Sequence, residues 1–237
     1  MNYGVVVAGG IGSRMGAEKP KQFLTIGTKP IIVHTVEKFV LFDDLEKIIV
    51  LTPEDWIEYT RDLLKKNLGE ALMEKVAVIQ GGATRNETIM NSIDYIDKNY
   101  GLDDETIIIT HDAVRPFVTH RIIRDNIDAV KKYGATDTVV PATDTIVESQ
   151  NGDTISFIPD RSKMYQGQTP QSFKAKELRE TYMALSEDEK AILTDATKIY
   201  VLKGKAVKLV KGESFNIKIT YPYDLEVAET LLKGESK

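Results

Sequence analysis

The residues best suited to chemistry lie in a glycine-rich loop near the start of the chain. Residues 8–15 read AGGIGSRM and residues 20–23 read PKQF, so glycines are followed by Arg14 and Lys21. Glycine lets backbone N–H groups approach phosphate oxygens without a Cβ in the way. Arg14 and Lys21 can neutralise a polyphosphate as charge builds up in a transition state. The loop therefore predicts a phosphate site, and a plain strand-to-helix turn with solvated charges is the alternative.

Two familiar glycine motifs do not fit this loop. A P-loop ends in Gly-Lys-Ser/Thr, which is absent here, and a GxGxxG pattern that starts at Gly10 fails because its last position is Met15. A nicotinamide-binding or ATP-hydrolysing function therefore loses its main support.

A second group of polar residues, HDAVRP, occupies residues 111–116 and follows the apolar run 106–110. Asp112 is expected at the carboxyl end of a strand, where α/β proteins bind ligands. Mg²⁺ needs only one or two protein carboxylates when phosphate oxygens and waters complete its shell. We predict that Asp112 binds Mg²⁺ or Mn²⁺, although an Asp that caps the following loop is an equal alternative. His111, His34 and His120 are interpreted as structural.

The elements that must position these residues alternate along the chain. Amphipathic helical patterns separate the apolar, β-branched runs and predict an α/β fold with a mostly parallel, doubly wound (Rossmann-like) sheet. The expected strands are 3–8, 47–52, 76–79, 106–110 and 138–141, and the expected helices are 30–40, 54–68, 85–96 and 121–133. Helices at 174–185, 187–192 and 222–232 and a strand at 206–210 follow.

The alternation stops after residue 141. Alternating segments at 144–149 and 154–158 flank Gln-Asn-Gly-Asp, and Asn-Gly is a strong hairpin signal. We predict a projecting β-hairpin arm at about 142–162. Because an isolated hairpin is marginally stable, a second subunit is expected to pack on it, which makes a homodimer a hypothesis.

Composition limits the class of protein. The chain has 237 residues, 42% hydrophobic and 28% charged, as expected for one globular domain over 1–237. The net charge of −5 argues against a nucleic-acid-binding surface. Apolar runs are too short to cross a membrane, and no signal peptide is recognisable, so we expect a cytoplasmic protein. Without cysteine there is no thiolate nucleophile.

An ordered set of motifs resembles the cytidylyltransferases that include the methylerythritol-phosphate and ribitol-phosphate enzymes. The resemblance extends from the first strand to the last helix. It is carried by AGGIGSRM and PKQF and then, in the family's order, by GGATRN at 81–86, HDAVRP, DT at 144–145, DR at 160–161, QTPQ at 168–171, TDA at 194–196 and NIKIT at 216–220.

The resemblance implies a role for each motif. It assigns catalysis to Arg14, Lys21 and Lys218, the metal to Asp112, and nucleotide binding to Ala8, Gly9, Gly10, Gly12, Gly82, Ala83, Arg85 and Thr88. It assigns the acceptor to Arg115, Thr145, Arg161, Thr169 and Thr194, with Thr145 and Arg161 reaching into the neighbouring subunit's site. Ala83 departs from the methylerythritol-type enzymes, which commonly have Asp there.

The implied reaction joins the CMP part of CTP to a small polyol phosphate and releases pyrophosphate. D-ribitol 5-phosphate is the favoured acceptor. The resemblance then implies CDP-ribitol production for teichoic acids of the cell wall and coupling to a reductase that supplies ribitol phosphate. Phe215 stands before Asn216 where the isoprenoid branch usually has Asp. The alternatives are 2-C-methyl-D-erythritol 4-phosphate as acceptor and, in another class, a noncatalytic nucleotide-binding regulatory module.

Overall fold

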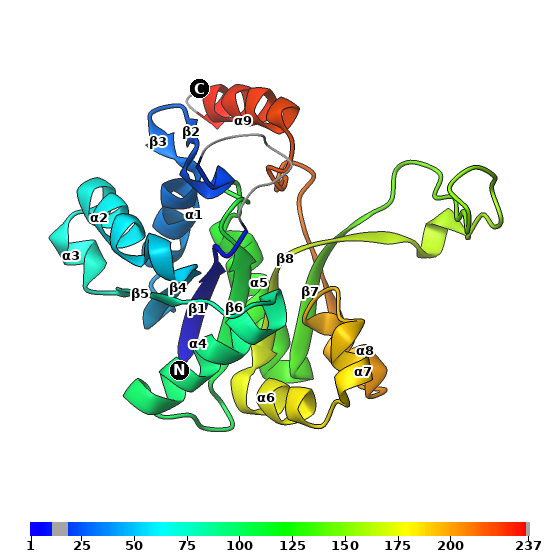
Figure 1. Ribbon diagram of the computed structural model, residues 1–237, viewed down its shortest axis with the longest axis horizontal. Helices are drawn as coiled ribbons and strands as arrows, with labels where there is room; N and C mark the ends of the chain where they lie inside the picture. The colour runs from blue at the N-terminus through cyan, green and yellow to red at the C-terminus, as the bar shows by residue number, and fades with distance from the viewer. Residues whose placement is uncertain (11–18, 236–237) are drawn as a thin grey trace.

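The computed structural model describes residues 1–10 and 19–235 (Figure 1). The strands are β1 Asn2–Val7, β2 Thr25–Ile26, β3 Lys29–Pro30, β4 Lys47–Thr52, β5 Val76–Gln80, β6 Ile107–Asp112, β7 Ala135–Pro141, β8 Tyr165–Lys174 and β9 Lys208–Lys211. The α-helices are α1 Ile31–Val40, α2 Ile57–Leu68, α3 Glu70–Met73, α4 Arg85–Tyr100, α5 His120–Tyr133, α6 Ala175–Met183, α7 Glu187–Ala191, α8 Thr197–Leu202 and α9 Pro222–Glu235. Three short 3-10 helices, Lys21–Phe23, Glu54–Trp56 and Arg161–Lys163, complete the secondary structure of the described residues.

One mixed sheet organises the molecule. Its strand order is β5-β4-β1-β6-β8-β7-β9. β5, β4, β1 and β6 pair in parallel, β8 runs antiparallel to both of its neighbours, and β9 is parallel to β7. The predicted mostly parallel α/β fold is therefore confirmed. The carboxyl ends of β1 and β6 lie side by side at one edge of the sheet, because Val7 is in register with Asp112.

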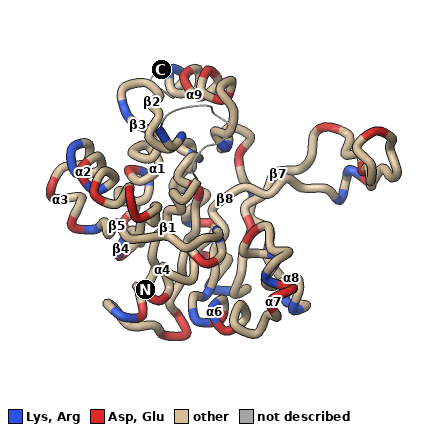
Figure 2. The backbone as a smooth tube through the Cα atoms, viewed as in Figure 1, with Lys and Arg blue, Asp and Glu red and all other residues tan. Residues whose placement is uncertain are grey.

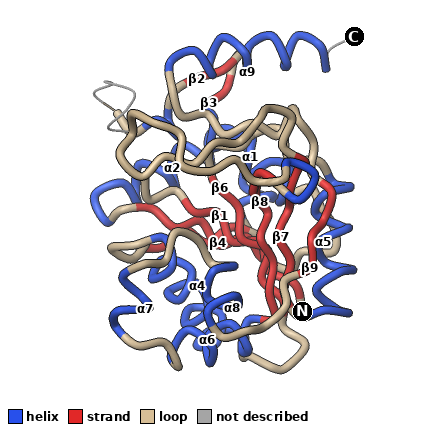
Figure 3. The backbone as a smooth tube through the Cα atoms, turned by 90° about the vertical axis from the view of Figure 1, so that its right-hand side faces the viewer, coloured by secondary structure: helices blue, strands red, loops and turns tan. Residues whose placement is uncertain are grey.

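Helices cover both faces of the sheet (Figure 3). Alternate residues of a strand point to opposite faces, and the burial follows this rule. In β1 and β6, Val6 and Ile109 belong to one buried cluster, which α1, α2 and α5 complete. Val5 and Ile108 belong to the other, which α4, α6 and α8 complete. The hydrophobic periodicity of the sequence thus produces two cores, one on each face of the sheet. Together they hold β1 and β6 in place and so position the edge where these two strands end.

β8 is a strand that the sequence pattern did not predict. It contains Gly167 and Pro170, which are typical of loops, and proline in a sheet is confined to edges and bulges. Here the pairing of β8 with β7 shifts between Asp137 and Val139, so residues 168–170 face an interruption of the ladder. Pro170 therefore lies where no ladder hydrogen bond is required of it.

The segment between β7 and β8 projects away from the sheet as an arm, residues 142–164 (Figure 1). The chain reverses at the predicted Asn-Gly, where Gly152 has φ +76°. The predicted hairpin strands are reduced to a single bridge between Glu148 and Phe157. No sheet or helix of the described chain covers the arm, and Ile155, Phe157 and Ile158 are each more than half exposed. Regular pairing is short because little apolar surface is buried to support it.

The remaining surface carries charges of both signs. Lys and Arg are interspersed with Asp and Glu along the chain (Figure 2). Among the described residues, no helix combines the length and the apolar character that a membrane span requires.

Candidate active site

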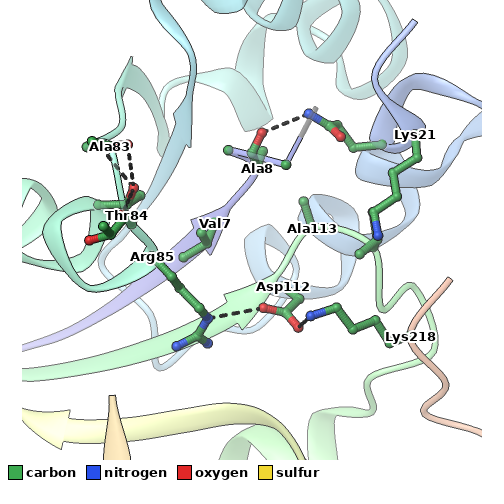
Figure 4. Close-up of a pocket in the computed structure, with 15 residues that line it drawn as sticks. Val7, Ala8, Lys21, Ala83, Thr84, Arg85, Asp112, Ala113 and Lys218 are labelled. Atoms are coloured by element: carbon green, nitrogen blue, oxygen red, sulfur yellow. Dashed lines mark hydrogen bonds and ion pairs between the residues drawn. The ribbon is translucent and has the colours of Figure 1, made fainter. Parts of the chain in front are cut away.

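A pocket of about 310 Å³ lies at the carboxyl ends of β1 and β6 (Figure 4). All of the described residues that the sequence assigned to the nucleotide, catalysis and the metal line it, although they come from five separate segments. They are Ala8, Gly9, Gly10, Lys21, Gly82, Ala83, Arg85, Thr88, Asp112 and Lys218. Gly12 and Arg14 lie outside the described residues.

The start of the glycine loop is held by a glutamine. Gln22 is buried in the 3-10 helix Lys21–Phe23, and its Nε2 donates to the Ala8 carbonyl at 2.7 Å. This bond ties the end of β1 to the segment that carries Lys21. Lys21 extends into the pocket from that segment (Figure 4). Sequence reasoning noted Gln22 only as part of the PKQF motif and gave it no function.

The loop before α4 forms a second wall. Thr84 caps α4 in a capping box with Glu87, and the Thr88 hydroxyl accepts from the Gly82 N–H at 2.9 Å. A Cβ added at Gly82 would lie 2.5 Å from Glu87 Cβ and 2.9 Å from the Thr88 nitrogen. Glycine is therefore required by the fold of this loop. The capped helix start places Arg85 at the pocket wall.

Asp112 is surrounded by the positive charges of the pocket. Lys218 Nζ lies 2.9 Å from Asp112 Oδ2, Arg85 Nε lies 3.5 Å from Oδ1, and Arg115 Nε lies 3.5 Å from Oδ2. Figure 4 shows Arg85 and Lys218 approaching the carboxylate from opposite sides. Burial alone would raise the pKa of Asp112, but Arg85, Lys218 and Arg115 hold it well below its usual value. Asp112 is therefore an anion throughout the physiological range.

Two buried side chains fix the backbone of Asp112. His111 Nε2 lies 3.0 Å from the Arg115 carbonyl, so it donates, and Nδ1 accepts from the Thr169 hydroxyl at 2.9 Å. Thr169 Oγ1 also accepts from the Asp112 N–H at 3.2 Å. Burial lowers the pKa of His111 to about 4, so the ring is neutral. The structural interpretation of His111 agrees with this geometry, and the Thr169 hydroxyl is already engaged by two protein partners.

The residues predicted to bind the acceptor are not gathered in one place. Arg115 is buried beside Asp112 and, with Lys218, lines a second pocket of about 540 Å³. Thr145 and Thr194 are exposed and lie outside the lining of both pockets. Arg161 lies on the arm, where its Nη1 donates to the Thr143 carbonyl at 3.0 Å. Within a single chain, the arm residues do not reach the Asp112 pocket.

Sequence reasoning missed a polar pair behind Arg85. Gln171 on β8 accepts from Arg85 Nη1 at 3.1 Å and donates from Nε2 to Asp137 Oδ1 at 3.1 Å. Gln171 belongs to the QTPQ motif, but Asp137 lies inside a strand pattern that gave no signal of a site.

Known proteins of one kind match this chain. The family model described as IspD, 2-C-methyl-D-erythritol 4-phosphate cytidylyltransferase, matches residues 3–234. A 4-diphosphocytidyl-2C-methyl-D-erythritol synthase of Anaerococcus prevotii is 25% identical, with a TM-score of 0.80 and coverage of 98% of this chain and 96% of that one. The 2-C-methyl-D-erythritol 4-phosphate cytidylyltransferase of Francisella tularensis is 26% identical, with a TM-score of 0.79 and coverage of 97% of this chain and 98% of that one. That of Thermus thermophilus is 25% identical, with a TM-score of 0.72 and coverage of 98% of this chain and 100% of that one.

The α/β sheet carries a glycine-lined, cationic pocket at its carboxyl edge. Together with these matches, this arrangement identifies the protein as a nucleotidyltransferase. The family model covers nearly the whole chain. The chain belongs to the IspD family, and it is a cytidylyltransferase.

Proposed function

We propose that this enzyme transfers CMP from CTP to a small polyol phosphate and releases pyrophosphate. The observation that carries the proposal is one pocket that Lys21 lines and in which Lys218 and Arg85 pair with Asp112, beside backbone that glycine leaves open. Cations and free N–H groups are what a triphosphate requires. A noncatalytic nucleotide-binding module has no need for this concentration of charge next to a buried carboxylate.

The reaction would be an in-line substitution at the α-phosphorus of CTP. An oxygen of the acceptor phosphate forms the new P–O bond, and the bond from the α-phosphorus to the bridging oxygen breaks, so that pyrophosphate leaves. The acceptor phosphate is largely dianionic near neutral pH, and no general base is required. The protein would hold two polyanions together and neutralise their charge with Lys21, Arg14 and Lys218.

Mg²⁺ or Mn²⁺ fits the donor set in the pocket. Asp112 supplies one anionic carboxylate, and a single carboxylate with phosphate oxygens and waters is a common Mg²⁺ environment. The described residues contain no cluster of three or more His, Asp or Glu side chains that could form a protein-only cage. The metal would add positive charge at the phosphates of CTP. EDTA should therefore abolish turnover, excess Mg²⁺ should restore it, and turnover in EDTA would contradict the assignment.

The proposed assembly is a homodimer held by the arms. The arm exposes Ile146, Val147, Ile155, Phe157 and Ile158, an apolar surface that a second copy could cover. It also holds Thr145 and Arg161, which do not line the Asp112 pocket of their own chain. Binding of the acceptor by the partner's arm would give both residues a function.

Two acceptors are candidates. The names of the matched family and structures favour 2-C-methyl-D-erythritol 4-phosphate. D-ribitol 5-phosphate is favoured by a residue of this chain, because Phe215 replaces the usual Asp before Asn216. In either case, the acceptor phosphate would approach from the side of Arg115 and Lys218, which line the second pocket together.

The deciding experiment measures pyrophosphate release from CTP and Mg²⁺ with each acceptor in turn. A kcat/KM at least about a hundredfold higher for one acceptor identifies it, since that ratio corresponds to about 2.7 kcal/mol in transition-state binding. If the protein binds CTP but releases no pyrophosphate with either acceptor, the result would favour the noncatalytic module.

A further inference from the structure

Arg85 is held at two points of its guanidinium group. Its Nε faces Asp112 Oδ1 at 3.5 Å, and its Nη1 donates to Gln171 Oε1 at 3.1 Å. Asp112 ends β6, and Gln171 lies within β8, the neighbouring strand. The planar fork of Arg85 is therefore fixed against two adjacent strands of the sheet, although Arg85 itself begins a helix.

The amide of Gln171 has only one orientation that satisfies both partners. Arginine has no acceptor, so the amide oxygen must face Arg85 and the NH₂ group must face Asp137. Gln171 Nε2 donates to Asp137 Oδ1 at 3.1 Å. Gln171 is only 3% exposed, so water does not compete for these bonds. Asp137 thus holds the amide in the one orientation in which its oxygen faces Arg85.

The charge state of Asp137 supports this polarity. Burial raises the pKa of Asp137 to about 6, with the charge of Asp195 adding to the rise, and Gln171, Arg85 and Arg115 oppose it. At neutral pH, Asp137 is mainly the carboxylate, which can only accept.

We propose that Gln171, oriented by Asp137, is a positioning residue that holds Arg85 in the conformation that binds CTP. Asp137, Gln171 and Arg85 form a directed chain of hydrogen bonds that ends at the Asp112 pocket. Arg85 is pre-organised before the nucleotide arrives, so less of the binding free energy is spent on ordering its side chain. This inference rests on the proposed binding of CTP in that pocket.

The test is a double-mutant cycle on CTP affinity, measured by calorimetry with CTP and Mg²⁺. Gln171→Met keeps the length of the side chain but removes the acceptor, and should weaken CTP binding about tenfold, as expected for one hydrogen bond to a charged group. Arg85→Ala should weaken it at least as much. In the Arg85→Ala background, Gln171→Met should add less than about twofold, because the effect passes through Arg85.

An isosteric exchange separates positioning from packing. Gln171→Glu keeps the shape but sets two carboxylates against each other, and should weaken CTP binding about tenfold or more at pH 7.5. Adding Asp137→Asn supplies an NH₂ donor to the carboxylate introduced at position 171 and should restore affinity to within about threefold of wild type. Ser172→Ala is the control, since Ser172 lies on β8 but bonds to Asn126 on the other face.

The outcomes separate failure of the proposed function from failure of the positioning role of Gln171. If wild-type protein does not bind CTP, the proposed function fails. If it binds CTP but Gln171→Met has no effect, or its tenfold loss persists in full without Arg85, the positioning role alone is wrong. A Gln171→Glu, Asp137→Asn protein that folds like the wild type and stays as weak as Gln171→Glu also overturns it. Unfolding midpoints measured in parallel identify any variant that fails to fold.

Discussion

Lys21 and Asp112 bring opposite charges into the same pocket, and each can be removed without disturbing the hydrophobic cores. Lys21→Ala should lower turnover by at least about a hundredfold, as expected for loss of a charge that stabilises the transition state. Asp112→Asn should do the same. Asn is preferred to Ala at Asp112 because it keeps the size of the side chain and an oxygen that can accept a hydrogen bond from the buried Arg115. Lys233→Ala on the exposed face of α9 is the control, and near-normal turnover would remove the tested residue from the catalytic set.

The buried His111 predicts a specific dependence of stability on pH. Its pKa of about 4 lies below the ordinary value of 6.5, so between these pH values the unfolded chain binds a proton that the folded chain excludes. Stability contributed by the neutral ring is complete above about pH 6.5 and decreases as the pH falls towards 4. Between about pH 6.5 and 5, wild type should lose about 1.5 kcal/mol more than His111→Gln. Urea unfolding at both pH values measures this, and equal losses would contradict it.

At the scale of secondary-structure elements, two glycines should respond differently to the same substitution. A Cβ at Gly82 would collide with the backbone of α4, whereas a Cβ at Gly10 meets nothing within 4 Å among residues 1–10 and 19–235. Gly82→Ala should therefore lower the unfolding midpoint as well as weaken CTP binding. Gly10→Ala should leave unfolding unchanged and weaken CTP binding about tenfold or more, because the new methyl group meets none of the residues that the structure describes and would meet a bound phosphate. Unchanged affinity in Gly10→Ala would place the phosphates elsewhere.

The elements that the sequence predicted well are those with one strong local signal. β1, β4 and β6 are apolar and β-branched because both faces of the sheet are covered, and α4 and α5 show clear amphipathic periodicity. β8 was missed because its glycine and proline are tolerated only at a bulge that depends on β7. The arm was predicted from Asn-Gly, but its pairing was overestimated because local patterning does not reveal a missing packing partner.

In the pocket, too, residues with a local sequence signal were predicted, and residues that depend on long-range strand pairing were not. Its glycines, Lys21, Asp112 and Lys218 were found through motifs that are compact in sequence. Gln171 and Asp137 were not assigned, since their importance arises only when β8 is inserted between β6 and β7. Contacts made by long-range strand pairing cannot be read from local periodicity.

At the scale of the whole molecule, the proposed sharing of residues between subunits predicts complementation. Arg161→Ala should raise the acceptor's KM about ten- to a hundredfold and leave CTP affinity unchanged, as expected for loss of a charge-assisted phosphate contact. Mixing Arg161→Ala with Lys21→Ala should restore about a quarter of wild-type activity, because half of the dimers are mixed and each has one intact site. Activity is measured at limiting acceptor after subunit exchange.

A matched mixture completes this test. Lys21→Ala mixed with Asp112→Asn should show no such recovery, because both changes lie in the same chain's pocket and every mixed dimer has two defective sites. Failure of the first mixture, with subunit exchange demonstrated by differently tagged chains, would show that Arg161 does not act across a dimer. It would leave the cytidylyltransferase activity unaffected.

The way the arm joins the sheet has a consequence for how this enzyme can diversify. Pro141 at the end of β7 is paired directly with Tyr165 at the start of β8, so the sheet itself holds the two ends of the arm together. For a loop closed in this way, each doubling of its length costs only about 0.6 kcal/mol of chain entropy. Insertions and deletions in the arm should therefore change the stability of the catalytic sheet very little. The part of the molecule proposed to meet the partner can change in length and sequence while the pocket at Asp112 stays unchanged.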